Sequence, residues 1–551
     1  MAKQKTKYIF VLGGVMSGIG KGIATSSIGK IIQSKGYKVT VLKIDPYVNV
    51  DAGTMNPTEH GEVFVLESGL ETDQDMGNYE RFLNITLPPD NYMTTGRVYQ
   101  AVINRERNLE YKGKCVQIIP HITNEIIGRI KKAGQKTGSD VVIIELGGTT
   151  GDYENQLFTE AARQMNLKCP DDTLFVMLSF IPYPKKIGEM KTKPTQQAVR
   201  LLNSAGVQPD IIIARSEQKI DDKRKEKIAL FCNVEPEAVI SAPDVESIYD
   251  VPLNFEKDGF GKVILKKLGL KENNKTDFNG WGEFVKKVHQ AKKEIKIGVV
   301  GKYFNTGACV LSDSYISVIE AIKHAAYNNN VVPVIDWIDA EMFEKNKKKI
   351  TILKDYDGII VPGGFGSRGI EGIISTIKFA RENKVPYLGL CYGMQLMVIE
   401  FARNVLGLTN AHTTEIKPRA KYKVIDLMEK QKANLKKGIY GATMRLGAYP
   451  CKIKSGTIAS RAYGKRNISE RHRHRYEVNN AYIKKLEKAG LVFSGTSPNG
   501  QLMEIAELPK VDHPFMLGSQ FHPEFTSSPL KPNPLFKEFI LSIKREKNKN
   551  K

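Results

Sequence analysis

Short runs of consecutive apolar residues recur along the chain, and each is followed by a glycine-rich or polar turn. In chain order they cover residues 8–12, 38–44, 141–146, 173–180, 210–215, 295–301, 358–361 and 385–390. Nearly continuous apolar runs of this kind are typical of strands buried on both faces of a parallel sheet. Because helical stretches separate the runs, the pattern predicts an α/β fold with doubly wound, mainly parallel sheets.

The hydrophobic signal weakens between residues 271 and 294, most clearly over the polar stretch 271–280. A fresh apolar strand begins at Ile295. We therefore expect a first domain at 1–270, a linker at 271–294 and a second α/β domain at 295–545. The basic tail, residues 546–551, is expected to be disordered.

Composition narrows the class of protein. Hydrophobic residues make up 41% of the chain and charged residues 26%, values typical of soluble globular proteins. No run reaches the roughly 18 apolar residues of a membrane helix, and residues 8–12 are too short for a signal peptide. The six cysteines form no CxxC pair, which argues against a zinc site or a disulfide framework. We expect a cytoplasmic protein that does not contact a membrane.

The formal net charge is +22. Such an excess of positive charge is compatible with binding to nucleic acid, to a membrane surface or to small anionic substrates. Much of the excess lies in lysine-rich helical stretches and in the tail, and no nucleic-acid-binding motif is present. We interpret the charge as solvated helix faces and expect no nucleic-acid partner.

Cys391 follows the apolar run 385–390 and precedes a helical stretch. On such a strand-to-helix turn, a side chain is lifted out of the sheet and faces the positive end of the helix, which favours a thiolate. Gly389 and Gly393 remove side chains that would crowd the turn. The alternative is an inert core cysteine.

Two further stretches argue against the inert alternative. Residues 362–366 (Pro-Gly-Gly-Phe-Gly) follow an apolar strand and are rich in backbone N–H groups suited to an oxyanion. Far downstream, His522 is followed by Glu524. Cysteine, histidine, carboxylate and an oxyanion loop form a complete set for acyl transfer.

These three stretches resemble the class I glutamine amidotransferases. The resemblance implies that Cys391 attacks the side-chain amide of glutamine, that His522 moves the proton and that Glu524 orients His522. It covers the C-terminal half and implies that this half produces ammonia.

Near the N-terminus, the glycine-rich stretch 13–23 lies between a strand and a helix. Bare N–H groups, the helix dipole and Lys21 suit a phosphate chain. The spacing departs from the standard P-loop, and Gly22 occupies the position where a hydroxyl would hold Mg²⁺. A glycine turn without a ligand is the alternative.

The metal would then need carboxylates from elsewhere. Asp75 lies in an acidic, glycine-containing stretch, and Glu145 lies at the end of an apolar strand, a usual place for a Mg²⁺ ligand. The alternatives are a solvated loop for Asp75 and a capped buried carboxylate for Glu145. Residues 191–196 (Lys-Thr-Lys-Pro-Thr-Gln) open a helix with cations and hydroxyls, which suits a polyphosphate.

Read together, the motifs resemble one family, the CTP synthases. They are Gly-Gly-Val-Met-Ser-Gly-Ile-Gly-Lys-Gly from residue 13, Lys-Ile-Asp-Pro-Tyr from 43, Asp-Ala-Gly-Thr-Met-Asn-Pro-Thr-Glu-His-Gly-Glu-Val-Phe-Val from 51, Glu-Leu-Gly-Gly-Thr-Thr-Gly-Asp from 145, Lys-Thr-Lys-Pro-Thr-Gln from 191 and Glu-Arg-His-Arg-His-Arg-Tyr-Glu-Val-Asn-Asn from 470. The resemblance spans nearly the whole chain.

The resemblance implies roles for four groups of residues. ATP would be held by Gly18, Ile19, Gly20, Lys21, Gly22, Ile23, Asp75 and Val245, with Mg²⁺ on Asp75 and Glu145. UTP or CTP would contact Ser17, Asp152, Tyr153, Glu154, Lys191, Thr192, Lys193, Pro194, Thr195, Gln196 and Lys227. Glutamine would be held by Gly364, Tyr392, Gly393, Met394, Gln395, Glu415 and Arg473.

The reaction implied is UTP + ATP + glutamine to CTP + ADP + phosphate + glutamate. Phosphorylation would convert the uracil 4-oxygen into a good leaving group, which ammonia then displaces. The resemblance also implies CTP as feedback inhibitor, GTP as allosteric activator and a homotetramer.

Departures from the family pattern are few. Gly18 stands where a second serine is common, Tyr392 replaces a usual leucine beside Cys391, and residues 440–445 depart from Gly-Gly-Thr-Met-Arg. A related glutamine-dependent ligase with a carboxylate acceptor is a rival interpretation, against which the 191–196 and 470–480 stretches argue. A non-catalytic filament or scaffold is another, against which Lys21, Cys391, His522 and Glu524 argue.

Overall fold

A computed structural model of the chain describes residues 5–186, 188–271, 278, 280–302, 305–306, 309–310, 312–428, 431 and 441–549. By its internal contacts the chain separates into two compact units. The first consists of Met1–Asp51 and Asn78–Val285, and the second of Ala52–Gly77 and Lys286–Lys551. A short segment from the first half of the sequence therefore belongs to the second unit.

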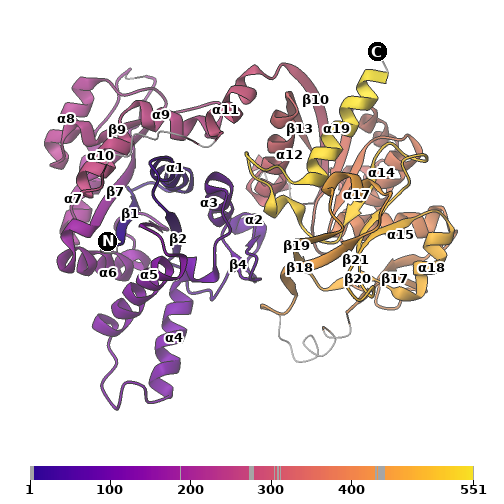
Figure 1. Cartoon of the computed structure of the whole chain (residues 1–551), viewed down its shortest axis with the longest axis horizontal. Helices are drawn as coiled ribbons and strands as arrows, with labels where there is room; N and C mark the ends of the chain where they lie inside the picture. Colours follow the sequence, from indigo (N-terminus) through magenta and orange to yellow (C-terminus); the bar gives the residue numbers. More distant parts are fainter. Residues whose placement is uncertain are drawn as a thin grey trace. The chain divides into compact units, whose positions relative to one another are not determined.

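The first unit is built on a seven-stranded sheet in which every pair of neighbours is parallel. Its strand order is β5-β2-β6-β1-β7-β8-β9. Figure 1 labels β1, β2, β7 and β9 of this sheet. The strands are β1 (Lys7–Gly13), β2 (Val39–Asp45), β5 (Tyr92–Thr94), β6 (Val141–Leu146), β7 (Thr173–Phe180), β8 (Ile211–Ser216) and β9 (Val239–Pro243). Each long apolar run of the first half forms one of these strands.

Helices cover both faces of this sheet. Along β1, Phe10 and Leu12 join a core with α4 (Thr95–Arg107), α5 (Thr123–Thr137), α6 (Gln156–Lys168), α7 (Lys193–Ser204) and α8 (Asp222–Cys232). On the other side lie α1 (Lys21–Ser34), α9 (Val251–Lys257) and α10 (Phe260–Lys267). The predicted doubly wound α/β fold is confirmed for this unit.

The second unit contains a nine-stranded mixed sheet of order β13-β10-β14-β15-β23-β22-β21-β18-β19. The neighbours from β13 to β23 are parallel and those from β23 to β19 antiparallel. The strands are β10 (Lys293–Gly301), β13 (Val331–Asp339), β14 (Gly358–Val361), β15 (Tyr387–Leu390), β18 (Arg445–Ile453), β19 (Asn467–His474), β21 (Val492–Thr496), β22 (Met503–Glu507) and β23 (Met516–Ser519).

Alternate residues of the parallel strands face two different cores. Ile359 and Val361 pack with α13 (Glu341–Lys345), α14 (Ile370–Glu382) and α15 (Tyr392–Asn404). Ile360 packs with α12 (Ile316–Asn328), α17 (Ile458–Tyr463) and α19 (Pro534–Lys549). This alternation explains why these strands are apolar at consecutive positions.

Smaller elements complete both units. They are α2 (Pro57–His60), β3 (Phe64–Val65), β4 (Glu71–Thr72), α3 (Asp75–Leu83), α11 (Trp281–Gln290), β11 (Asn305–Thr306), β12 (Cys309–Val310), β16 (Ala411–Thr413), β17 (Tyr422–Leu427), β20 (Tyr476–Val478) and α18 (Asn480–Lys488). Short helical segments are η1 (Pro89–Asn91), η2 (Ile118–Ile122), η3 (Tyr153–Asn155), η4 (Pro170–Asp172), η5 (Pro236–Ala238), η6 (Ile248–Asp250), η7 (Ser312–Tyr315), η8 (Lys347–Asp355) and η9 (Pro523–Thr526).

Residues 52–77 contact the rest of the second unit through apolar and polar side chains. Phe64 meets the ring of Phe525 edge-on, with centroids 5.1 Å apart. Arg471 donates from Nη1 to the carbonyl oxygen of Val65 at 3.0 Å. Glu62 is buried and accepts from the backbone N–H of Ser317 at 3.1 Å.

The expected disorder of the C-terminal tail is wrong for residues 546–549, because α19 continues to Lys549. Its last turns are held by charged partners. Arg545 pairs with Glu538 at 3.0 Å, and Lys547 pairs with Asp357 at 2.6 Å. Residues 550 and 551 lie outside the described residues.

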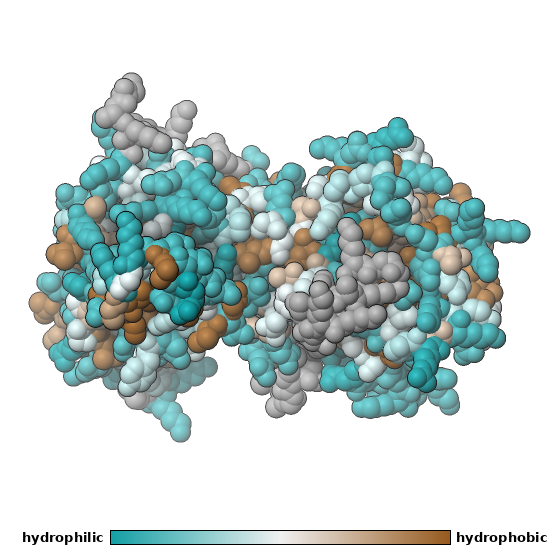
Figure 2. Space-filling model, turned by 90° about the horizontal axis from the view of Figure 1, so that it is seen from below, coloured by the Kyte–Doolittle hydropathy of each residue, from teal (hydrophilic) through white to brown (hydrophobic). Residues whose placement is uncertain are grey.

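Hydrophilic side chains dominate the face drawn in Figure 2, with hydrophobic residues in smaller groups among them. Among the described residues, no helix is both long enough and apolar enough to cross a membrane.

Candidate active sites

Cys391 occupies the turn between β15 and α15, as predicted. Its backbone has φ +50° and ψ −95°, a region that side-chain-bearing residues adopt only under strain. The turn is closely packed: a Cβ at Gly393 would lie 2.3 Å from the carbonyl oxygen of Val361, and one at Gly389 would lie 2.7 Å from Gly393. The predicted need for glycine at both positions is confirmed.

His522 follows β23, the strand next to β15 in the sheet. Its Nδ1 lies 2.7 Å from Oε1 of Glu524, which fixes the ring and points Nε2 away from the carboxylate. Within the described parts of the chain, Nε2 has no hydrogen-bond partner. Burial alone would lower the pKa of His522, but the charges of Glu524 and Cys391 outweigh it and raise that pKa to about 10.

The cysteine, the histidine and the glycine loop surround one small cavity. A Cβ placed on Gly363 would lie 2.8 Å from Cε1 of His522 and 3.8 Å from Cβ of Cys391. Gly364, Arg473 and Glu524 line the same cavity. A thiol, an imidazole oriented by a carboxylate and a glycine loop on one cavity can perform acyl transfer.

Arg473 contributes both its backbone and its side chain to this cavity. Its carbonyl oxygen lies 3.8 Å from Sγ of Cys391, and its Nε donates to Oε1 of Glu71 at 2.8 Å. The guanidinium lies over the ring of Phe365, 5.2 Å from the centroid. Glu71 was not predicted to take part in this site, because its acidic stretch is typical of a solvated loop.

The other residues expected to hold glutamine surround the turn. Tyr392, Gly393, Met394 and Gln395 form the first turn of α15. Nε2 of Gln395 donates to the carbonyl oxygen of Tyr476 at 2.9 Å. Glu415 accepts from the backbone N–H of Gly366 at 3.1 Å, and burial raises its pKa despite that bond. One N–H group of the predicted oxyanion loop is thus already used within the protein.

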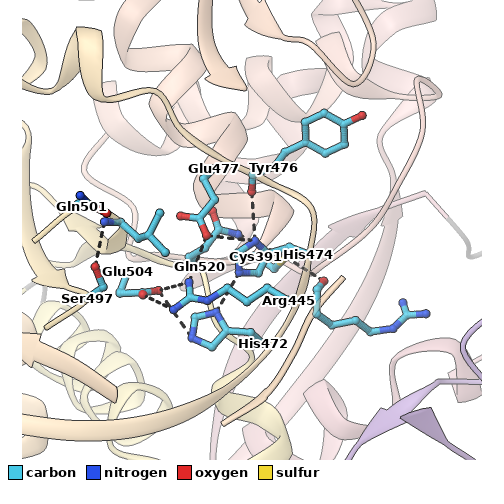
Figure 3. A network of polar contacts seen from close by, with 12 residues as sticks. Cys391, Arg445, His472, His474, Tyr476, Glu477, Ser497, Gln501, Glu504 and Gln520 are labelled. Atoms are coloured by element: carbon cyan, nitrogen blue, oxygen red, sulfur yellow. Dashed lines mark hydrogen bonds and ion pairs between the residues drawn. The ribbon is translucent and has the colours of Figure 1, made fainter. Parts of the chain in front are cut away.

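A buried polar network joins side chains of β18, β19, β20 and β22 (Figure 3). Nδ1 of His472 and Nε2 of His474 are 2.9 Å apart, and Arg445 pairs with Glu504 at 2.7 Å and Glu477 at 3.1 Å. Burial, followed by the charge of Arg445, lowers the pKa of both histidines well below its usual value. Burial raises the pKa of Glu477 to about 8.

The alternation of β19 explains its sequence. His472 and His474 enter the buried network, while Arg471 and Arg473 contact residues of the 52–77 segment. Gln520 directly follows β23, the strand next to β15, and donates from Nε2 to Sγ of Cys391 at 3.6 Å. The sequence analysis did not single out Gln520.

In the first unit, the glycine loop between β1 and α1 has a backbone conformation that residues with side chains rarely adopt. Gly18 and Gly20 have φ values of +69° and +89°. Nζ of Lys21 donates to the carbonyl oxygen of Gly148 at 2.6 Å. A cavity of about 220 Å³ is lined by Gly18, Ile19, Gly20 and Ile23, and Val245 lines it too. Arg215, Asn254 and Phe255, which the sequence analysis did not identify, complete part of its wall.

The residues expected to contact the pyrimidine nucleotide form two groups in this unit. Oδ2 of Asp152 accepts from the backbone N–H and hydroxyl of Thr149 at 2.7 and 2.8 Å, whereas Tyr153 and Glu154 are exposed on η3. Ser17 is also exposed, in the glycine loop.

The second group surrounds the start of α7. Lys193 and Pro194 begin this helix, Thr195 bonds to Ser179 at 2.9 Å, and Gln196 donates to Thr192 at 3.2 Å. Lys191 pairs with Glu189 at 2.8 Å. That hydrogen bond, with the charges of Lys191 and of the exposed Lys227 on α8, lowers the pKa of Glu189.

The two expected metal ligands are placed as follows. Glu145 is buried at the end of β6, where Oε1 accepts from Lys43 at 2.8 Å and Oε2 accepts from Tyr79 at 2.5 Å. Asp75 begins α3, and its backbone N–H donates to Asp73 at 2.8 Å. No group of three or more metal-binding side chains occurs among the residues that the structure describes.

Two features define the class of protein. The first unit has a parallel sheet with a phosphate-type glycine loop, and the second has a cavity with cysteine, histidine and glutamate. Together they define a class of two-part glutamine-dependent enzymes. Family models agree with both parts: "CTP synthase N-terminus" matches residues 7–270, and "Glutamine amidotransferase class-I" matches residues 310–542.

Individual relatives match nearly the whole chain. The CTP synthases of Thermococcus gammatolerans and Pyrococcus abyssi are both 52% identical over 544 residues, covering 98% of this chain and 99% and 98% of theirs. A solved structure of the Trypanosoma brucei CTPS glutaminase domain with bound acivicin is 35% identical, with a TM-score of 0.42, covering 46% of this chain and 94% of that one.

The chain belongs to the CTP synthase family. It is a ligase that forms a C–N bond in the glutamine-dependent conversion of UTP to CTP.

Proposed function

We propose that Cys391 is the nucleophile that releases ammonia from glutamine. The thiolate attacks the side-chain carbonyl carbon, and the loop 362–366 stabilises the resulting oxyanion. His522 gives its proton to the leaving nitrogen, so ammonia departs and a thioester forms. Water activated by His522 then hydrolyses the thioester to glutamate and restores the thiol. The observation that carries this proposal is the hydrogen-bonded His522–Glu524 pair beside the strained cysteine turn.

Glutamine itself would be held by the residues around that turn. Gly364 lines the cavity, and Arg473 offers a cation to the substrate carboxylate. Tyr392 to Gln395 and Glu415 would complete the site.

The first unit would activate UTP. ATP would bind the cavity formed by residues 18–23 and Val245, with Lys21 stabilising the charge of the transferred phosphoryl group. The phosphoryl group passes to the 4-oxygen of UTP, and ammonia then displaces phosphate. A shielded passage would keep the ammonia unprotonated on its way.

Mg²⁺ would be held by Asp75 and Glu145 and would neutralise phosphate charge during transfer. Carboxylates suit this ion, although the Oε1 atom of Glu145 now accepts from Lys43. The Oε2 atom accepts from Tyr79, so Mg²⁺ would share both oxygens of Glu145 with these donors.

UTP and CTP would share the residues Ser17, Asp152 to Glu154, Lys191 to Gln196 and Lys227. A triphosphate would compete with Glu189 for Lys191. Because both nucleotides carry the same triphosphate, we expect CTP to inhibit competitively with UTP. The proposal also includes GTP as activator, a homotetramer, a cytoplasmic location and a functional division into residues 1–270, 271–294 and 295–545, as the family resemblance implies.

The test compares two nitrogen sources. Cys391→Ala should abolish CTP synthesis from glutamine but keep synthesis from ammonium salt at high pH. Cys451→Ala is the matched control, because Cys451 is a buried thiol of the same unit whose pKa burial raises. Equal loss of both activities in Cys391→Ala would refute the assignment. Product analysis with UTP, ATP and glutamine checks the overall reaction.

A further inference from the structure

Several contacts converge on Gly366, the last residue of the glycine loop beside Cys391. Its N–H donates to Glu415 at 3.1 Å. Its carbonyl oxygen accepts from Nζ of Lys302 at 2.5 Å and from the hydroxyl of Tyr392 at 3.2 Å. Both polar groups of this one residue are therefore held by side chains from distant parts of the sequence.

Lys302 is a buried cation, with 4% of its surface exposed. It follows β10, and its Nζ lies 4.2 Å from the centroid of the Tyr392 ring. Burying an ammonium group is costly unless carbonyl oxygens, a ring face or opposite charge replace its water. Here the carbonyls of Phe365 and Gly366 and the face of Tyr392 do so.

The backbone of Lys302 is held as well. Arg368, two residues beyond Gly366 in sequence, donates from Nη2 to the carbonyl oxygen of Lys302 at 2.6 Å. The lysine is thus bonded to the glycine loop through its side chain and to the following residues through its backbone. Such a two-point attachment restricts the loop's movement relative to β10.

Tyr392 connects this attachment to the reactive turn. It is the residue after Cys391, so its hydroxyl ties the first turn of α15 to the far end of the glycine loop. We propose that Lys302 and Tyr392 are positioning residues that hold the loop 362–366 at a fixed distance from Cys391, so that its N–H groups meet the developing oxyanion. This proposal rests on the proposed role of Cys391.

Preorganised N–H donors stabilise an oxyanion only when they already lie at the right distance. A leucine at position 392 could fill space but could offer neither a hydroxyl to Gly366 nor a ring face to Lys302. The tyrosine and the lysine therefore work as a pair. Removing either leaves the other with a weaker hold on the loop.

The charge state of Lys302 gives the pair a pH dependence. Burial is the main cause that lowers the pKa of Lys302 to about 8, and the charge of Arg368 lowers it further. The charges of Glu415 and Glu344 act in the opposite direction and raise it. Above pH 8 the neutral amine keeps a hydrogen bond but loses its charge-assisted hold and its attraction to the ring of Tyr392. Glutaminase activity should therefore decline above pH 8 through this group.

The experiment uses the full-length enzyme and measures glutamate release and ammonia-dependent CTP synthesis separately. Lys302→Met and Tyr392→Leu should lower the glutaminase kcat by about 10- to 100-fold, less than the roughly 10²–10³-fold loss of an oxyanion donor itself. The KM for glutamine should change much less in Lys302→Met, because Lys302 is not among the residues proposed to hold glutamine. Tyr392→Phe, which keeps the ring, should show a smaller loss.

Control measurements separate positioning from folding. Lys488→Met removes an exposed lysine of the same unit and should change neither activity. Lys302→Met should keep ammonia-dependent synthesis and lose the component of the alkaline decline that belongs to Lys302. Wild-type glutaminase kcat in both Lys302→Met and Tyr392→Leu would overturn the proposal, as would equal loss of glutaminase and ammonia-dependent activity. Failure of the proposed function itself would show independently, as glutamine-dependent turnover in Cys391→Ala.

Discussion

Glu71 offers a sharp test of how the 52–77 segment serves the glutaminase site. Its carboxylate accepts from Nε of Arg473 at 2.8 Å, and the exposed fractions of the two side chains are 1% and 11%. Nε is one of the five N–H donors of arginine, so the bond to Glu71 orients the guanidinium and leaves other donors for a substrate carboxylate. We predict that Glu71→Gln raises the KM for glutamine.

The magnitude follows from the burial of the pair. Removing one partner of a buried ion pair costs about 3–5 kcal/mol, but glutamine keeps an acceptor oxygen and Arg473 is not fully buried. A loss of about 1.5 kcal/mol in glutamine binding is then reasonable, which corresponds to a roughly tenfold higher KM. Glu71→Ala, which also removes the acceptor, should have a larger effect and should lower the melting temperature.

The assay is glutamate release as a function of glutamine concentration, with ammonia-dependent CTP synthesis measured alongside. Gly53→Ala should reproduce the effect, because a Cβ there would lie 2.1 Å from Oε2 of Glu71 and displace the carboxylate. Glu59→Gln, an exposed acid of the same segment, is the matched control. An unchanged or lower KM in Glu71→Gln would show that Glu71 does not orient Arg473 for the substrate.

Three further predictions concern other sites. Glu524→Gln should reduce glutaminase kcat and should flatten the pH dependence of stability. Because the pKa of His522 is raised to about 10, its imidazolium stabilises the fold fully below about pH 6.5, and this contribution is lost towards pH 10. A melting-temperature profile over that range that is the same as in the wild type would contradict the prediction. Lys21→Ala should reduce CTP synthesis from glutamine and from ammonia alike, by about 10²–10³-fold, since both need activated UTP; wild-type ammonia-dependent turnover would refute the role. Glu154→Ala should weaken CTP inhibition more than it raises the KM for UTP, because an exposed acid can accept from the amine of CTP but not from the oxygen of UTP; inhibition kinetics at fixed ATP and glutamine decide between the two.

Local patterns were enough to locate most of the chemistry. The apolar runs became the parallel strands of both units, and the turn at Cys391 formed where glycine, cysteine and glycine follow one another. The pairing of His522 with Glu524 is also local, since the two residues are two positions apart. Such signals survive in a sequence because they depend on neighbours along the chain.

The tail shows where local reasoning fails. Lysine-rich composition predicted disorder for residues 546–549, but Lys547 pairs with Asp357. The apolar face of α19 packs in the core that also contains Ile360, α12 and α17. The lysine-rich composition reflects only the polar face of this helix. It contains no information on the residues, distant in sequence, that bind the helix in the folded protein.

Sequence alone determined which residues carry reactive groups and on which turns they stand: Cys391 after a strand, Lys21 in a glycine loop and Glu145 at a strand end. Tertiary structure decided what surrounds them. Residues 52–77 leave the first half of the sequence to pack with the second unit, which brings Glu71 to Arg473 across 402 positions of sequence, and Lys302 reaches Gly366 across 64. These contacts depend on the path of the folded backbone and on which buried charge can find a partner, and neither is encoded in the spacing of residues along the chain.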